Sequence, residues 1–319
     1  MNGSLARTAI RATGLRKSYG EQVVLDSIDL EVAEGTVFAL LGPNGAGKTT
    51  TIQILSTLIA ADSGQIEIAG HDLAKEPDAV RRLIGVTGQF SAVDGLFSGR
   101  ENLQLMADLR HLGKSEARRL VDELLQRFDL VDAASKPVAT YSEGMKRRLD
   151  LAMTLVGDPR IIFLDEPTAG LDPRSRRVVW QTINDLVADG VTILLTTQYL
   201  EEADRLAHRI GVLDHGRFVA EGSPAELKRL VPGGHIRLTF TDRLELDRAA
   251  KVLSDGSRDD EALTLQVPSD GGAHSLRSLL DRLDAASLDV DQLAVETPDL
   301  DDVFLSLTGD QEPTGVTVP

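Results

Sequence analysis

The segment GPNGAGKT, residues Gly42–Thr49, decides the fold of this chain, because it matches the phosphate-loop pattern G-x-x-x-x-G-K-[ST]. It follows TVFALL (36–41), a continuous apolar run typical of a strand buried on both faces. It precedes TTTIQILSTLI (49–59), which has a helical pattern. A plain glycine turn is the alternative, and the order strand, loop, helix disfavours it. The sequence therefore predicts an α/β fold with a phosphate site.

The loop supplies the groups that hold a nucleotide triphosphate. Its glycines let backbone N–H groups surround phosphate oxygens, and the following helix N-terminus adds positive potential. Lys48 is expected to reach the outer phosphates, and Thr49 to place its hydroxyl on Mg²⁺. The predicted binding residues are Gly42, Pro43, Asn44, Gly45, Ala46, Gly47, Lys48, Thr49 and Thr50.

A second motif, RIIFLDEPTAGLD (160–172), is an apolar strand that ends in two carboxylates. Open α/β folds bind ligands at the carboxyl edge of the sheet, where Asp165 and Glu166 are expected. We predict that Asp165 holds Mg²⁺ and that Glu166 polarises the attacking water. Alone, the pair would indicate no more than an exposed strand end, but the glycine loop supports the catalytic interpretation.

The remaining pattern predicts two domains. Alternating strands come first, helices occupy the middle of the first domain, and apolar strands then return, which is typical of a mainly parallel sheet with an inserted helical segment. Val231-Pro232-Gly233-Gly234 resembles a linker. The predicted limits are 1–230 for the α/β domain, 89–158 for its helical subdomain, 231–309 for a small α+β module and 310–319 for a disordered tail.

Composition excludes several classes of function. The 319 residues include no cysteine, which removes disulfides, thiol nucleophiles and cysteine metal sites. The net charge is −16, and residues 231–319 carry 7 Lys and Arg against 18 Asp and Glu, or −11, which argues against nucleic acid as a partner. The longest apolar runs fall short of the roughly 20 residues that span a bilayer, so we expect no membrane span. No signal peptide is expected either.

Together these motifs resemble the ATP-binding subunit of an ABC transporter. The resemblance implies a P-loop NTPase fold with a RecA-like core, an antiparallel β subdomain and an inserted helical subdomain, and it implies ATP hydrolysis with Mg²⁺. It also implies further roles for residues that match the family pattern. Tyr19 would stack on adenine, Gln89 would contact Mg²⁺ and nucleotide, Ala169–Asp172 would form the D-loop, and Ser142, Gly144 and Met145 of the signature motif would bind nucleotide.

The chain is more narrowly similar to the daunorubicin/doxorubicin-resistance type of ABC ATPase. Three segments carry this likeness: VTGQFSAVD (86–94), LTTQYLEEAD (195–204) and LDDVFLSLTG (300–309). The resemblance implies a subunit that powers export of drugs or lipids through a separate integral membrane permease. It further implies an ATP-dependent head-to-tail homodimer at the cytoplasmic face of the membrane.

The signature helix departs from helix rules and from the family. Lys146, Arg147 and Arg148 crowd its first turn, where the helix dipole disfavours positive charge. In the family this helix points at ATP held by the other chain, so Lys146 and Arg147 either favour that negative field, face water, or serve the helical subdomain. Glu143 replaces the expected glycine. Its carboxylate either turns outward or weakens dimer closure or turnover.

Other positions leave alternatives open. Gln198 stands where most ABC ATPases have histidine, and we predict that its amide senses the γ-phosphate. His208 is expected on a surface helix rather than as a displaced substitute for that histidine. Phe90 and Phe97 suit either docking of the permease or the core of the helical subdomain. Two functional alternatives also remain: a soluble ABC-type ATPase without a membrane partner, and a nucleotide-binding regulatory module with impaired turnover.

Overall fold

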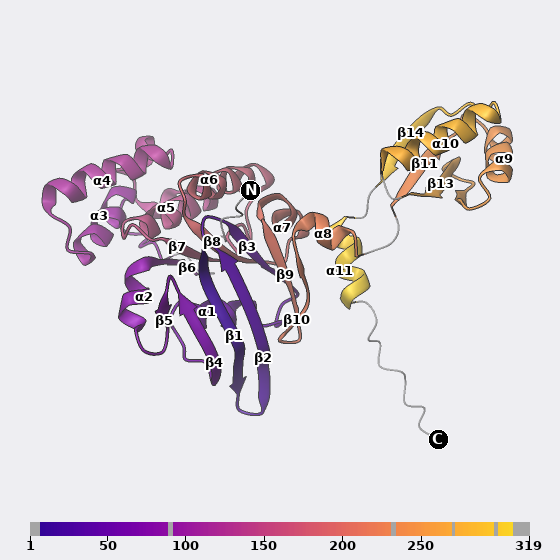
Figure 1. The fold of residues 1–319 in the computed structure, drawn as a ribbon. Helices are drawn as coiled ribbons and strands as arrows, with labels where there is room; N and C mark the ends of the chain where they lie inside the picture. Colours follow the sequence, from indigo (N-terminus) through magenta and orange to yellow (C-terminus); the bar gives the residue numbers. More distant parts are fainter. Residues whose placement is uncertain (1–6, 89–91, 231–233, 270–271, 297–298, 309–319) are drawn as a thin grey trace, which may run out of the picture. The chain divides into compact units, whose positions relative to one another are not determined.

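The computed structural model describes residues 7–88, 92–230, 234–269, 272–296 and 299–308. The chain divides into two compact units, Met1–Pro224 and Ala225–Pro319, which Figure 1 shows in indigo to orange and in orange to yellow. The predicted linker at 231–234 and the predicted tail lie almost entirely outside the described residues. In the described part of the chain, no helix is both long and apolar enough to cross a bilayer.

A six-stranded sheet forms the centre of the first unit, in the order β10-β9-β3-β8-β7-β6. All neighbouring pairs are parallel except β9 and β10, which form an antiparallel hairpin. Every residue of β3, β7 and β8 is buried, as their continuous apolar sequences require. The strands are β3 (Val37–Leu41), β6 (Ile84–Thr87), β7 (Ile161–Asp165), β8 (Thr192–Thr197), β9 (Arg209–Asp214) and β10 (Arg217–Gly222).

A four-stranded antiparallel sheet, in the order β2-β1-β4-β5, packs into the same core. Ile10 and Leu25 from this sheet share one buried cluster with Phe38 of β3 and Ile52 of the helix after the phosphate loop. Its strands are β1 (Thr8–Tyr19), β2 (Gln22–Ala33), β4 (Ser63–Ile68) and β5 (His71–Asp72). The predicted α/β fold with an antiparallel β subdomain is therefore confirmed.

The helices α3, α5 and α6 of the first unit begin at side-chain caps. Ser98 and Glu101 form a capping box, and Ser142 and Asp172 accept N–H bonds at the starts of their helices. In Figure 1, α3 and α4 lie away from the sheets beyond α5. The elements are α1 (Lys48–Leu55), α2 (Pro77–Leu83), α3 (Gly99–Leu109), α4 (Lys114–Arg127), η1 (Val131–Ala133), η2 (Val138–Thr140), α5 (Glu143–Leu155), α6 (Pro173–Ala188) and α7 (Leu200–Leu206), while α8 (Pro224–Lys228) spans the boundary of the two units.

The second unit is an α+β module with an antiparallel sheet in the order β12-β13-β11-β14. Side chains from β11 and β13 form a core with α9 and α10. At the sheet edge, Leu293 and Val295 of β14 are 36% and 42% exposed. The elements are β11 (His235–Thr239), α9 (Arg243–Val252), β12 (Ser257–Asp259), β13 (Thr264–Pro268), α10 (Ala273–Ala285), β14 (Gln292–Glu296) and α11 (Leu300–Thr308).

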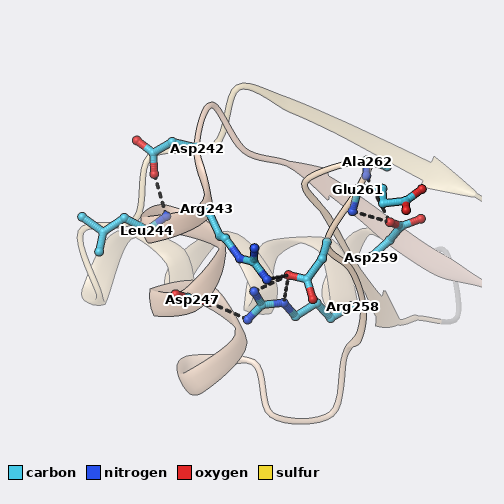
Figure 2. A network of polar contacts seen from close by, with 9 residues as sticks. Asp242, Arg243, Leu244, Asp247, Arg258, Asp259, Glu261 and Ala262 are labelled. Atoms are coloured by element: carbon cyan, nitrogen blue, oxygen red, sulfur yellow. Dashed lines mark hydrogen bonds and ion pairs between the residues drawn. The ribbon is translucent and has the colours of Figure 1, made fainter.

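The short strand β12 was not expected, because Ser257–Asp259 has no apolar alternation. Arg258 of this strand pairs with Asp247 on α9 at 2.6 Å, as Figure 2 shows. Arg258 also pairs with Asp260. Arg243 reaches the same Asp260 at 3.5 Å. The segment pairs with β13 and carries these ion pairs, neither of which its own apolar periodicity reports.

Candidate functional site

The phosphate loop joins the buried end of β3 to the start of α1. Gly45 and Gly47 have φ angles of +85° and +109°, which side chains other than glycine rarely adopt. A Cβ atom on Gly47 would lie 2.6 Å from Leu25 Cδ2, so β2 closes one side of the loop. Pro43, Asn44, Gly45 and Thr49 are exposed, Thr50 is half-buried, and Gly42, Ala46, Gly47 and Lys48 are buried.

Lys48 lies at the centre of this arrangement, with its side chain almost fully buried. Its ammonium donates to the main-chain oxygens of Gly42 at 2.7 Å and Pro43 at 3.1 Å. It also lies 3.8 Å from the Glu166 carboxylate. Burial lowers the pKa of Lys48, while Glu166 and Asp165 act in the opposite direction. The ammonium is therefore fixed between the loop and the end of β7.

Asp165 ends β7 and is buried beside the loop. Its Oδ1 accepts hydrogen bonds from the hydroxyls of Thr49 at 3.2 Å and Thr196 at 2.6 Å. A carboxylate and a hydroxyl on adjoining segments are oxygen ligands of the kind that Mg²⁺ takes together with substrate phosphates. The geometry of these two side chains fits the predicted metal site.

Glu166 has a φ angle of +48°, a left-handed conformation that is uncommon for glutamate. Its N–H bonds to Thr196, to the carbonyl at 3.2 Å and to the hydroxyl at 3.0 Å. Backbone strain of this kind persists where surrounding contacts impose it and is concentrated at functional sites. It turns the Glu166 carboxylate toward Lys48.

Gln198 directly follows β8, the strand between β3 and β7, and its side chain is exposed. The carbonyl of the preceding Thr197 accepts the Gly42 N–H at 3.4 Å. The backbone of Gln198 therefore lies beside the phosphate loop, as a γ-phosphate sensor requires. Gln89, the other predicted polar contact on this edge, lies outside the described residues.

Tyr19 lies at the end of β1, paired with Gln22 across the hairpin, and is 50% exposed. The Lys17 ammonium lies 5.4 Å from its ring centroid. Val24 follows two residues after Gln22, and its carbonyl oxygen would lie 2.9 Å from a Cβ atom on Gly47. The hairpin that carries this exposed ring thus packs on the phosphate loop.

The signature residues form the N-terminus of α5. Ser142 Oγ accepts the Met145 N–H at 3.3 Å, and a Cβ on Gly144 would lie 2.6 Å from Ser175 Oγ of α6. The Glu143 side chain is 70% exposed and pairs with Lys146 at 2.8 Å, so its carboxylate turns outward. Among the described residues, no hydrogen bond or ion pair joins these signature residues to the phosphate loop of the same chain.

Arg147 corrects one expectation. It neither faces water nor lies free to favour a bound anion, because its guanidinium is buried. It donates to the carbonyls of Pro167 at 2.8 Å, Gly88 at 3.1 Å and Asp165 at 3.2 Å, and it pairs with Asp150 at 3.3 Å. Burial lowers the pKa of Arg147 and raises that of Asp150. Arg147 thus ties the signature helix to the segments after β6 and β7.

Two further basic residues are also fixed by the fold. Arg148 donates to the Phe128 carbonyl at 2.8 Å and pairs with Asp129, so it serves the helical subdomain. The prediction that His208 lies on a surface helix is wrong, because α7 ends at Leu206. The His208 ring accepts the Val37 N–H at 3.1 Å, at the opposite end of β3 from the phosphate loop. It therefore cannot replace Gln198.

This sheet order, with a glycine loop and two carboxylates at its carboxyl edge, defines a P-loop ATPase of the ATP-binding cassette class. A family model described as ABC transporter matches residues 25–169. The chain is 48% identical over 308 residues to Daunorubicin resistance ATP-binding protein DrrA3 of Streptomyces coeruleorubidus, covering 96% of this chain and 98% of that protein. It belongs to the family of ABC transporter ATP-binding proteins, and the predicted resemblance is confirmed.

Solved structures agree with this assignment. An ATP-binding subunit of an ABC transporter aligns with a TM-score of 0.63 at 31% identity, over 70% of this chain and 93% of that one. A dimeric ATP-binding cassette in a post-hydrolysis state, bound to ADP and Pi, aligns with a TM-score of 0.61 at 26% identity, over 67% of this chain and 98% of that one. The chain is an ATP-binding ATPase subunit.

Proposed function

We propose that this ATPase hydrolyses ATP between two head-to-tail copies of the chain and so powers export of drugs or lipids through a separate permease. One observation carries the proposal for the catalytic centre. Lys48 lies 3.8 Å from the Glu166 carboxylate while Thr49 bonds to Asp165, so the groups for phosphate, water and metal meet at one sheet edge. Phosphoryl transfer depends on such positioning and charge stabilisation.

Each group has a defined task in the proposed mechanism. Lys48 exchanges its bonds to loop carbonyls for bonds to the outer phosphates, and the loop N–H groups bind the remaining oxygens. Glu166 accepts a proton from the attacking water. Gln198 donates its amide to the γ-phosphate, and Tyr19 stacks on adenine.

Mg²⁺ fits the oxygen pair of Asp165 and Thr49, with Gln89 as a further candidate ligand. When bound, it neutralises charge on the phosphates and lowers the barrier to their transfer. Asp165 is held for this task by Thr196, whose hydroxyl donates to the same carboxylate oxygen at 2.6 Å.

The signature helix supports the proposed dimer. Ser142 caps α5, and the N–H groups of Gly144 and Met145 lie in its first turn, where an anion is favoured. These groups do not contact the phosphate loop of their own chain, so a second chain is needed to bring an ATP γ-phosphate to them. The ion pair with Lys146 compensates the negative charge of Glu143, which stands where the family has glycine.

Export by way of a permease rests on the similar proteins and on one exposed segment. The similar Streptomyces protein is a daunorubicin resistance ATP-binding protein. Leu96 is strongly exposed and Phe97 is 40% exposed, which favours docking of a membrane subunit over a place in the subdomain core. Phe90 lies outside the described residues. The proposed location is accordingly the cytoplasmic face of the membrane.

Two experiments test the proposal. Glu166→Gln should abolish turnover but trap an Mg-ATP-dependent dimer on size-exclusion chromatography, whereas Lys48→Ala should lose the dimer. A monomer in both variants would refute the dimeric site. Co-expression with a candidate permease should raise daunorubicin resistance of a sensitive host. Equal resistance with the Glu166→Gln variant would refute ATP-driven export.

A further inference from the structure

Glu202 is a fully buried carboxylate near the start of α7, four residues after Gln198. Its Oε1 accepts hydrogen bonds from Thr168 Oγ1 at 2.7 Å and Trp180 Nε1 at 2.9 Å. A buried charge is costly, so a carboxylate with partners on three separate segments needs a reason beyond filling space. The proposed mechanism assigns Glu202 no task.

One partner belongs to the turn that carries Glu166. Thr168 lies two residues after Glu166, and this turn is closed by the Ala169 N–H bond to the Glu166 carbonyl at 3.2 Å. Through its hydroxyl, Thr168 joins this turn to Glu202 on α7. Movement of Glu202 would therefore displace the turn next to Glu166.

On the other side, Glu202 is connected to the segment of Gln198. The Glu202 N–H donates to the Tyr199 carbonyl at 3.1 Å, and the Tyr199 N–H donates to Thr197 Oγ1 at 2.9 Å. The Arg176 guanidinium of α6 lies 4.8 Å from the centroid of the Tyr199 ring. Residues on both sides of Gln198 are thus fixed, while the Gln198 side chain itself is exposed.

The cluster surrounds one oxygen of the Glu202 carboxyl with hydrogen-bond donors and leaves the other without a hydrogen bond among the described residues. Burial raises the pKa of Glu202, while the hydroxyls of Thr197 and Thr168, the indole of Trp180 and the charge of Arg176 oppose that shift. Glu202 Oε2 and Arg176 Nε are both buried and have no hydrogen bond within the described part of the chain. Within the described residues, the cluster therefore contains one acceptor and one donor whose hydrogen-bonding capacity is unused.

We propose that Glu202 is a positioning residue for ATP hydrolysis. It ties the turn after Glu166 to the segment of Gln198, and so fixes the distance between the group that activates water and the group that senses the γ-phosphate. Neither function requires Glu202 to touch the nucleotide. The inference rests on the proposed roles of Glu166 and Gln198 and adds the element that holds them together.

The test compares two near-isosteric variants, Glu202→Gln and Thr168→Val, in steady-state ATPase assays and in equilibrium binding of a fluorescent ATP analogue. We expect kcat to fall about tenfold or more for Glu202→Gln and several-fold for Thr168→Val, with KM and nucleotide affinity within about twofold of wild type. Thr182→Val is the matched control, because the hydroxyl of this half-buried α6 residue donates to the Val178 carbonyl of its own helix. It should behave as wild type.

Wild-type kcat in both variants would overturn the proposal. So would parallel losses of kcat and nucleotide binding, which indicate a merely structural role. Should Glu202→Gln fail to fold, Thr168→Val alone decides, because it leaves the carboxylate bonded to Trp180. Failure of the proposed function has a different signature: full turnover in Glu166→Gln or Gln198→Ala, whatever the Glu202 variant does.

Discussion

Replacing Arg147 by methionine tests whether this arginine is a structural tie rather than an anion-binding group. Methionine retains much of the apolar stem but removes the guanidinium that pairs with the buried Asp150 carboxylate and donates to three carbonyls. Removing one partner of a buried ion pair costs about 3–5 kcal/mol. The exposed pair of Arg127 with Asp189 provides the control, and Arg127→Met should cost no more than about 1 kcal/mol.

Trp180 makes this measurement specific to the first unit, because it is the chain's only tryptophan and is buried on α6. Its fluorescence during urea unfolding reports the stability of that unit without a contribution from the second. A loss for Arg147→Met within about 1 kcal/mol of the Arg127→Met loss would refute the reasoning.

The same variant has a pH dependence with a defined sign. Burial raises the pKa of Asp150, and the charge of Arg147 opposes this shift. Without Arg147 the pKa rises further, so the folded state retains a proton that the unfolded chain releases. Stability of the variant relative to wild type therefore falls as pH rises from the carboxyl pKa of the unfolded chain through that of the folded variant. A pH-independent loss would contradict this account.

Three further predictions concern the nucleotide site. Lys146→Gln should weaken Mg-ATP-dependent dimerisation of the Glu166→Gln protein by about 1.4- to 5-fold per site, the value of an exposed ion pair. Glu143→Gly should reverse this effect. Unchanged dimerisation in Lys146→Gln would show that Lys146 does not compensate the charge of Glu143. Gln198→Ala should lower kcat more than ATP affinity, and equal losses in the two assays would count against its sensor role. Gly42→Ala would place a Cβ 2.2 Å from a β9 carbonyl oxygen, so its thermal midpoint should fall by several degrees and ATP binding should be lost, and wild-type values would contradict this packing.

The phosphate loop and its carboxylates could be predicted because each chemical role there requires particular residues at a fixed local spacing. The prediction for Arg147 was wrong because it considered only the interaction of its charge with the helix dipole. Its spacing contained a signal: Gly144 and Leu151 lie three and four residues away on the same helix face, and both are buried. Its partners at Gly88 and Pro167 are main-chain carbonyls distant in sequence, and no residue pattern reports them.

Glu202 shows the same limit in another form. Within LTTQYLEEAD, Glu201 and Glu202 are alike in sequence, yet the first is exposed and the second fully buried. Helical period places Glu202 on the same face as Leu206, which is also buried, but it does not supply the hydroxyl and indole that bind the carboxylate. The hydroxyl of Thr168 and the indole of Trp180 come from segments that are distant in the sequence. Similarly, β12 is a strand through its pairing with β13, although its own sequence has no apolar alternation.

The strand β14 lies at one edge of the second unit's sheet, as the described residues define it, and this has a practical consequence for handling the protein. An edge strand with exposed Leu293 and Val295 is a template for pairing with another chain, and natural sheets resist this with charge. Asp291 precedes the apolar pair, Glu296 after it is paired with Arg237, and residues 231–319 carry a net charge of −11. High salt or acid removes that repulsion. Precipitation on storage should therefore begin at this strand, and low ionic strength at neutral pH should delay it.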